Sequence, residues 1–597
     1  MRKLFLLAIL AAATTMSLQA KQPAKIQSQN GKLTAVIQNN DIAVKYGKQT
    51  AIELNGILDN SNLLRFVRSI NEDYYMVAGK QLHCVNHANE YVADKNDCKL
   101  VFRIYDDGIA FRYEYENLKA GPAPQENTTF RIKEGTKRWM QKWSDGSEGF
   151  YPVSTTSKAE NGNNRWGFPL LIEPEEDLYA LISEADITGK QSAACLYSDG
   201  ELFKVVPDVN KATIEGKWHT PWRVVIIGKL SDIVESTLVT DVSTPSQITK
   251  TSWIKPGVVS WVYWAYNHGS NDYNIIKKYV DLAVALKLPY VLIDAEWDEM
   301  KDGKTIEDAV KYALDNGVKP MIWYNSTVGW IDGAPGPKYR LNKPEDREKE
   351  FAWCEKIGVA GVKIDFFAGE TQMNMDYCIE LLEATAHHHL LCNFHGATVP
   401  RGWQRTWPNL LSTEGVYGAE WYNNVPTFTD KAAKHNATLP FTRNVIGPMD
   451  YTPCAFSDSQ HPHITTHAHE LALTVLFESG LQHIADRPES LLEQPQMVRD
   501  FFSELPVAWD ETRLVDGFPG DFVVMARRSG STWYIAGING TDEERTLPVK
   551  FNFVKPAKPN SITLFADGSP WDISSPKKMP TALKVKPRGG FVIKIKI

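Results

Sequence analysis

The chain has 597 residues, of which 43% are hydrophobic and 23% charged, and its formal net charge is −7. This length is too great for one ordinary core and predicts about two to four domains. The composition excludes a disordered or collagen-like chain, and the acidic balance gives no basic surface that would attract nucleic acid.

The first twenty residues have the pattern of an export signal. Met1-Arg2-Lys3 is a basic start, residues 4–14 are apolar, and Ser17-Leu18-Gln19-Ala20 is a plausible cleavage site. The apolar stretch is shorter than the roughly 20 residues of a membrane anchor, and no comparable run recurs. No Cys stands at the cleavage point to take a lipid. We therefore expect residues 1–20 to be removed and the mature protein to be soluble, in a periplasm or outside the cell, with no membrane span.

Residues 21–252 show short alternating runs broken by Asn, Asp and Gly, for example at 33–37, 42–46 and 110–115. Helix signals are nearly absent there. Closely spaced strands with turn signals predict a large antiparallel β-sandwich domain. The seven cysteines, an odd number spread from Cys84 to Cys454, do not resemble a disulfide framework, although Cys84 and Cys98 are placed to bridge a hairpin.

Residues 253–505 change to apolar strands that alternate with segments of helical period. Eight strands are expected, at 258–264, 290–293, 321–324, 361–367, 390–394, 411–416, 445–449 and 481–485. Helices are expected at 273–286, 306–316, 344–357, 373–386 and 467–480. Eight strand-helix units over roughly 250 residues predict a (β/α)8 TIM barrel. Its sixth and seventh units are irregular.

Residues 506–597 return to strands alone, at 522–526, 532–537, 545–551, 561–565 and 590–597, and predict a C-terminal β domain, again a sandwich. No low-complexity linker separates the three domains, so we expect them to pack tightly.

The most informative segment is the predicted barrel strand at 361–367, which carries Lys363 and Asp365 among Val, Ile and Phe. Residues two apart on a strand point the same way, so the two charges face one another at its carboxyl end. One interpretation is a carboxylate nucleophile held by an ammonium group, and the other is a structural ion pair.

The expected carboxyl ends of the barrel strands carry mostly acidic, amide and aromatic residues. They are Trp261 and Trp264, Asp294, Glu296 and Trp297, Asp365, Asn393 and His395, Glu414 and Glu420, and Asp450. Carboxylates that accept hydroxyl hydrogen bonds and aromatic faces that pack on C–H surfaces suit a neutral polyhydroxyl ligand. Walker, G-x-G-x-x-G, H-E-x-x-H and G-x-S-x-G motifs are missing from the sequence, which disfavours nucleotide, zincin and esterase chemistry.

Two further segments bear on metals. Glu414 and Glu420 flank a Gly-containing loop after a predicted strand, which is either a general acid beside a metal ligand or a solvated loop. Oxygen ligands of this kind favour calcium if a metal binds. We interpret the run His387-His388-His389 as a solvated helix terminus rather than as a metal site.

Several long motifs resemble glycoside hydrolase family 97. They are Gly361-Val362-Lys363-Ile364-Asp365-Phe366-Phe367, Asn393-Phe394-His395-Gly396, Arg401-Gly402-Trp403-Gln404-Arg405-Thr406-Trp407-Pro408-Asn409, and Glu414-Gly415-Val416-Tyr417-Gly418-Ala419-Glu420-Trp421, with two sandwich-domain motifs at 105–113 and 165–171. The resemblance covers nearly all of the mature chain.

The resemblance implies a retaining α-galactosidase with Asp365 as nucleophile and Glu420 as acid/base. The inverting α-glucosidase branch has a base Glu after the His of the fifth strand, where this chain has Gly396. Retention further predicts carboxyl groups about 5–5.5 Å apart. Lys363, Asp294, Glu296, Trp297, Trp261, Asn393 and His395 are the expected substrate-binding residues.

By the same resemblance a calcium ion lies beside the acid, bound by Glu414, Glu420 and, from the first domain, Glu184. The alternatives are a β-L-arabinopyranosidase or an inverting α-glucosidase on the same scaffold, or a sugar-binding protein without turnover. The expected partners are an α-galactoside, as a small molecule or an oligosaccharide, and calcium, with no nucleic acid.

Overall fold

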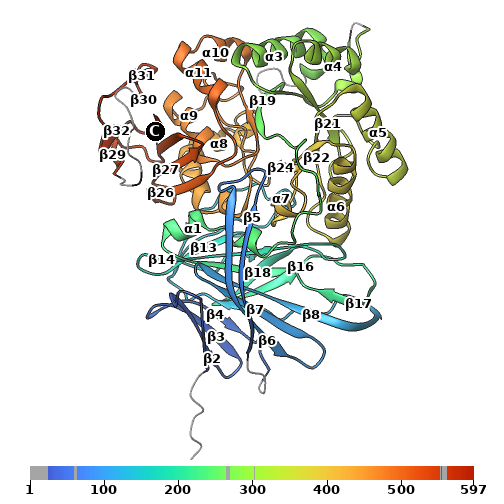
Figure 1. Ribbon diagram of the computed structural model, residues 1–597, viewed down its shortest axis with the longest axis vertical. Helices are drawn as coiled ribbons and strands as arrows, with labels where there is room; N and C mark the ends of the chain where they lie inside the picture. The colour runs from blue at the N-terminus through green and yellow to red at the C-terminus, as the bar shows by residue number, and fades with distance from the viewer. Residues whose placement is uncertain (1–23, 60–63, 264–268, 302, 551–552, 554–560) are drawn as a thin grey trace, which may run out of the picture.

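The computed structural model describes residues 24–59, 64–263, 269–301, 303–550, 553 and 561–597. Figure 1 shows three parts: antiparallel sheets from the first third of the chain at the bottom, a ring of parallel strands and helices at the upper right, and a second antiparallel part at the upper left. The expected three-part architecture is confirmed. The expected boundaries near residues 252 and 505 stay predictions.

The N-terminal part consists of two large antiparallel sheets, as predicted. The first sheet runs, in spatial order, through β1 (Ala24–Gln27), β2 (Leu33–Gln38), β3 (Asp41–Tyr46), β4 (Gln49–Asn55), β9 (Thr129–Arg131), β16 (Leu202–Pro207), β15 (Ala194–Asp199) and β12 (Arg165–Trp166). The second runs through β11 (Val153–Ser154), β10 (Lys137–Trp139), β13 (Leu170–Glu175), β14 (Leu178–Ala185), β18 (Trp222–Gly228), β8 (Gly108–Gly121), β7 (Lys99–Tyr105), β6 (His83–Asp94) and β5 (Arg65–Tyr75), and β17 (Ile214–His219) pairs with β8.

Alternation of side chains along these strands builds the core between the sheets. Leu33, Ala35 and Ile37 of β2 are buried while their neighbours are partly or fully exposed, which is the period-2 pattern of a half-buried strand. Two short helices, α1 (Leu230–Glu235) and α2 (Leu238–Asp241), end this part. The suggested Cys84–Cys98 bridge is wrong, because both thiols are free: Cys84 is near the start of β6 and Cys98 lies in the turn that follows its far end.

The barrel contains a parallel sheet in the order β24 (Leu410–Thr413), β23 (Leu391–Phe394), β22 (Gly361–Asp365), β21 (Lys319–Asn325), β20 (Tyr290–Ile293), β19 (Gly257–Trp261) and β25 (Leu481–Ile484). The helices of this part are α3 (Tyr273–Leu286), α4 (Ile306–Asp315), α5 (Pro344–Ile357), α6 (Gln372–His387), α7 (Trp403–Thr406), α8 (Pro426–Asn436), α9 (His467–Leu476), α10 (Pro488–Leu492) and α11 (Gln496–Glu504). Each predicted helix therefore forms, to within a few residues.

The strand expected at 445–449 does not form within the described residues. The short helix η5 (Arg443–Ile446) occupies part of it, and Gly447 and Pro448 follow. Proline has no N–H for a strand ladder, and the φ of +148° at Gly447 departs from strand geometry. The segment still closes the barrel, because Asp450 N donates to Thr413 O of β24 at 3.0 Å and Met449 N donates to Glu478 O, just before β25, at 2.8 Å.

Local signals fix the helices that flank β22. Helix α5 begins with Pro344 and ends at Gly358, whose φ of +92° suits glycine. Helix α6 begins after Thr371, whose side chain accepts the Asn374 N–H. The two helices precede and follow β22 in the chain, and the carboxyl end of β22 belongs to the end of the barrel where active sites lie.

The C-terminal part is a sheet in the order β26 (Glu511–Phe518), β27 (Phe522–Ser529), β28 (Thr532–Asn539), β33 (Gly590–Lys596), β30 (Ile562–Asp567) and β31 (Trp571–Ser574). A separate pair joins β29 (Arg545–Pro548) to β32 (Ala582–Val585). The strand expected at 545–551 ends at Pro548, and residues 551–552 lie outside the described residues.

One hydrophobic cluster continues through all three parts. It includes Tyr105 and Leu181 of the N-terminal sheet, Ile364 of the barrel, and Ile538 and Val592 of the C-terminal sheet. Tight packing of the three parts follows from this shared core. Among the described helices, none combines the length and the apolar character that a membrane crossing requires.

Candidate active site

Asp365, the last residue of β22, lies at the mouth of the barrel beside Lys363. The Lys363 Nζ is 3.8 Å from Asp365 Oδ2 and 3.2 Å from Asp294 Oδ2, and the ammonium group is buried. The predicted placement of Lys363 and Asp365 on one face is confirmed. Burial opposes the charged ammonium, but Asp294 and Asp365 hold the pKa of Lys363 above its ordinary value.

The Asp365 carboxylate is held by N–H donors on both oxygens. Trp323 Nε1 of β21 donates to Oδ2 at 3.0 Å, and the Phe366 backbone N–H donates to Oδ1 at 2.8 Å. Burial raises the pKa of Asp365, and Lys363 and the Trp323 N–H oppose that rise because they favour the anion. The carboxylate is therefore fixed in orientation while its solvation is poor, which suits a nucleophile.

A second cluster of carboxylates lies beside Asp365. Burial, Glu148 and Glu420 raise the pKa of Glu414 well above its ordinary value. Burial raises the pKa of Glu420, although Lys363 and a hydrogen bond with Glu414 oppose this. Burial and Glu420 also raise the pKa of Glu148 to about 8, and its side chain accepts the Trp421 Nε1–H at 2.7 Å. Glu148 comes from the N-terminal part, so that part completes the site.

The donor chemistry of this cluster fits a hard divalent cation. Three carboxylates approach one another, and Glu414 takes one backbone N–H, from Gly396 at 2.7 Å. The Nδ1 of His395 lies 3.4 Å from Glu414, and atoms of His395, Glu414 and Glu420 lie within 4.8 Å of one another. Several oxygen ligands are what Ca²⁺ prefers, and Glu148, Glu414 and Glu420 would hold it.

Buried Asp450 orients the residues behind the site. It accepts hydrogen bonds from Asn393 Nδ2 at 2.7 Å and His395 Nε2 at 2.7 Å, and His483 Nδ1 lies 2.9 Å from the same oxygen. Burial opposes its ionisation, but His483 and His395 hold the pKa of Asp450 well below its ordinary value. Asn393 and His395, expected to bind substrate, are thus part of a fixed network.

Glu184 does not join the carboxylate cluster. It is fully buried, with Arg401 Nε at 2.6 Å, the Ala194 N–H at 2.8 Å, and Arg223 in close contact. Two guanidinium groups already neutralise its carboxylate, so the expectation that Glu184 ligates the metal is wrong for this geometry. The Glu184–Arg401 pair instead joins the N-terminal part to the barrel.

Glu296 and Trp297, expected to bind substrate, contact other protein groups, whereas Asp294 lies beside Lys363. Strand β20 ends at Ile293, so Asp294 and Glu296 do not share a strand face, and Glu296 accepts from Asn271 Nδ2 at 3.0 Å. Trp297 is buried, packs between Tyr324 and Trp353 of α5, and donates to the Trp323 carbonyl at 2.6 Å.

Trp261 is a positioning residue rather than an open platform. It is buried, and its Nε1–H donates to Asp294 Oδ2 at 2.8 Å. The ring of Tyr263 stacks on it at 5.1 Å. Trp264, which the sequence also placed at the mouth, lies outside the described residues.

Sequence reasoning missed three residues of the site. Trp323 lies within a strand that was predicted, and its register opposite Lys363 would have shown that it shares a layer with that residue. Tyr263 is close enough to Glu420 and Asp294 that these charges, after burial, raise the pKa of its phenol. Glu148 stands in the irregular stretch Gly146-Ser147-Glu148-Gly149, which carries no periodic signal.

Gly396 fits tightly against the candidate nucleophile. A Cβ at this position would lie 3.0 Å from Asp365 Oδ1 and 2.9 Å from Phe366 N, and the φ of Gly396 is +49°. Contacts this short are rarely tolerated, so a side chain here would displace Asp365. The position where the inverting branch has its base therefore has no room for one.

A TIM barrel with several carboxylates at its mouth is the arrangement that many glycoside hydrolases use. Family models bear this out: residues 16–245 match the glycosyl-hydrolase 97 N-terminal domain, residues 253–416 match glycoside hydrolase 97, and residues 508–596 match the glycosyl-hydrolase 97 C-terminal, oligomerisation domain. The chain belongs to glycoside hydrolase family 97.

Two curated relatives and one solved structure show which family members the chain resembles. A probable retaining alpha-galactosidase of Streptomyces bingchenggensis is 37% identical over 73% of this chain and 67% of its own length. A retaining alpha-galactosidase of Bacteroides thetaiotaomicron is 28% identical over the full length of both chains. The crystal structure of a beta-arabinopyranosidase aligns with a TM-score of 0.86 and 28% identity, over 96% of this chain and all of the other.

Proposed function

We propose that the chain is an exported, exo-acting retaining α-galactosidase. The names of the two curated relatives support the activity, and the signal-like residues 1–20 support export to a periplasm or beyond the cell. The observation that carries the proposal is the close packing of Gly396 on Asp365. This packing argues against a base at residue 396 and supports Asp365 as the attacking carboxylate.

In the proposed reaction Asp365 attacks the anomeric carbon of a terminal α-galactoside. Glu420 gives its proton to the leaving oxygen, and a covalent glycosyl ester on Asp365 forms as the glycosidic bond breaks. Glu420 then removes a proton from water, which attacks the anomeric carbon on the face opposite Asp365 and breaks its bond to the Asp365 oxygen. Asp365 leaves as the free carboxylate, and the sugar keeps its α configuration.

The buried surroundings suit the two roles. The Lys363 ammonium and the Trp323 N–H favour ionised Asp365, as a nucleophile requires. Burial raises the pKa of Glu420, which is the direction that a general acid requires. Calcium held by Glu148, Glu414 and Glu420 would supply positive charge beside the acid and order its side chain.

Azide rescue tests the roles of the two carboxylates. In Asp365→Gly azide enters from the vacated face, so an α-galactosyl fluoride should yield the inverted β-galactosyl azide. In Glu420→Ala azide should attack the covalent ester and yield the α-azide from an aryl α-galactoside with a good leaving group. NMR of the products, with the wild-type enzyme giving α-galactose first, distinguishes the two outcomes. If Asp365→Gly gave the α-azide and Glu420→Ala the β-azide, or if Asp365→Gly kept full activity, Asp365 would not be the nucleophile.

A second candidate is a β-L-arabinopyranosidase, which the likeness to the beta-arabinopyranosidase structure favours. Its sugar lacks the hydroxymethyl group of galactose, so a residue crowding that group would exclude α-galactosides. Specificity constants for p-nitrophenyl α-galactoside, α-glucoside and β-L-arabinopyranoside separate the candidates. An initial β-product from the α-glucoside would indicate inversion, and no turnover of any of them would indicate a binding protein.

A further inference from the structure

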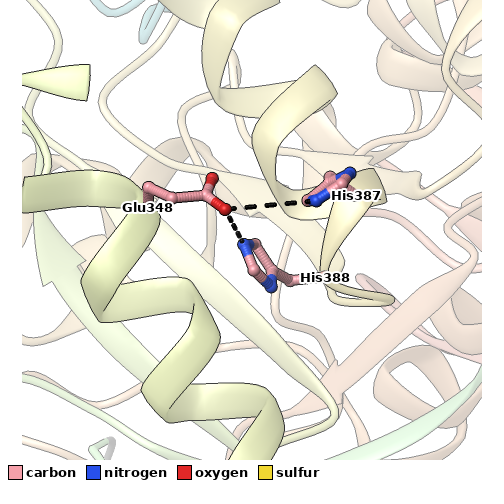
Figure 2. Close-up of side chains that lie close together, drawn as sticks. All are labelled: Glu348, His387 and His388. Carbon is pink, nitrogen blue, oxygen red and sulfur yellow. Dashed lines mark ion pairs between the residues drawn. The ribbon is translucent and has the colours of Figure 1, made fainter. Parts of the chain in front are cut away.

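A cluster of histidine and glutamate side chains lies on helices α5 and α6, outside the candidate active site. Figure 2 shows Glu348 of α5 pointing toward His387 and His388 at the end of α6. Glu348 Oε1 lies 3.1 Å from His388 Nε2 and 4.0 Å from His387 Nε2, and all three atoms lie within 4.8 Å of one another. The end of α6 leads into the start of β23, so the cluster is at the opposite end of the barrel from Asp365.

His388 is not the solvated residue that the sequence predicted. Its side chain is 8% exposed, whereas that of His387 is 73% exposed. Its Nε2 is buried and makes no hydrogen bond, although the Glu348 oxygen is only 3.1 Å away. A buried ring nitrogen without a hydrogen bond is costly unless another ligand satisfies it.

The other nitrogen of His388 is already fixed. Its Nδ1 lies 3.2 Å from Oε2 of Glu355, which is about two turns beyond Glu348 on α5. Histidines that ligate metals usually contact a carboxylate through their second nitrogen, which sets the tautomer and aims the lone pair. The Nε2 lone pair of His388 is thereby directed at the space that Glu348 and His387 share.

We propose that Glu348, His387 and His388 bind one divalent transition-metal ion of the zinc class. Metal–ligand bonds of about 2.0–2.1 Å in a tetrahedral site place neighbouring ligand atoms about 3.3 Å apart, between the two separations seen here. Exposed His387 has the freedom to close its longer distance. Two imidazoles and one carboxylate, with water in the fourth position, suit zinc. Calcium, which takes six to eight oxygen ligands, suits this site badly.

The ion would tie the end of α6 to the middle of α5. These helices immediately precede and follow β22, the strand that carries Lys363 and Asp365. The site is therefore a structural clamp, remote from the reacting sugar, and its loss should leave turnover intact.

Zinc titration of the full mature enzyme in excess calcium tests the site, by calorimetry and by the visible spectrum of bound Co²⁺. We expect one equivalent of zinc to bind and to raise the melting temperature, and bound cobalt to show tetrahedral absorption. His387→Ala and Glu348→Gln alter exposed side chains and should fold normally. Each removes a direct ligand and should weaken binding by about 100-fold or more.

His389→Asn is the matched control. His389 belongs to the same run and contacts Glu355 rather than Glu348, and Asn tolerates its φ of +54°. The His389→Asn variant should bind zinc with an affinity within a few-fold of that of the wild type. The proposal fails if the wild type binds no zinc, or if His387→Ala and Glu348→Gln bind as tightly as the wild type, which would indicate adventitious surface binding.

Discussion

Gly396→Ala tests whether the space beside Asp365 controls catalysis. The added Cβ would stand 3.0 Å from Asp365 Oδ1 and 2.9 Å from the Phe366 N, where ordinary contacts begin near 3.4 Å. The backbone atom cannot yield easily, so the carboxylate must move by several tenths of an ångström. Because a displacement of about 1 Å can cost about 100-fold in rate, we expect kcat to fall by roughly 10–100-fold.

The substitution also costs stability, because alanine disfavours a φ of +49° by about 1–2 kcal/mol. Gly317→Ala is the matched control for this cost. Its φ is +76°, but a Cβ there would meet nothing within 4 Å, and it lies in the turn before β21. It should lower the melting temperature similarly and leave kcat unchanged.

Initial rates on p-nitrophenyl α-galactoside, or on whichever of the three substrates the enzyme turns over, give kcat and KM for both variants and the wild type. A Gly396→Ala enzyme with wild-type kcat would refute the argument that Gly396 sets the position of Asp365. A fall in kcat that the Gly317→Ala enzyme shared would attribute the effect to backbone strain instead.

Three further predictions concern the metal, the domain junction and pH. Chelation should lower kcat, and Glu148→Gln should raise the calcium concentration that restores it, as measured by activity titration; an unchanged requirement would remove Glu148 from the site. Glu184→Gln should destabilise the fold by about 3–5 kcal/mol in urea unfolding, because it breaks buried pairs with Arg223 and Arg401. The same variant should leave the calcium concentration that restores activity unchanged. Burial raises the pKa of Asp241 to about 7, so the folded state binds the proton of this carboxyl more tightly than the unfolded state does. The free energy of unfolding should therefore fall as the pH rises from about 4 to 7, by at most about 4 kcal/mol. Asp241→Asn should flatten that decline in melting temperature, and an equally steep decline in the variant would assign it to other groups.

Local signals in the sequence were enough to predict the three-part architecture and most elements. Alternating apolar residues predicted the strands of the sheets, and apolar residues at helical spacing predicted α3 to α6. Lys363 and Asp365 were predicted to share a face because residues two apart on a strand point the same way. The segment at 445–449 was mistaken for a strand because its apolar residues resemble one. Gly447 and Pro448 prevent the ladder, and the barrel closes there through single backbone hydrogen bonds.

The sequence by itself determined the chemistry that is available: a carboxylate beside an ammonium group on a barrel strand, further acids on a later loop, and the family to which these motifs belong. Only the tertiary structure decided which distant residues meet. Glu148 reaches the acids while Glu184 is neutralised by two arginines, and His388 turns inward against α5 instead of into solvent. The physical reason is that strand and helix periods follow from local geometry, whereas the partner of a buried charge depends on how separate domains pack.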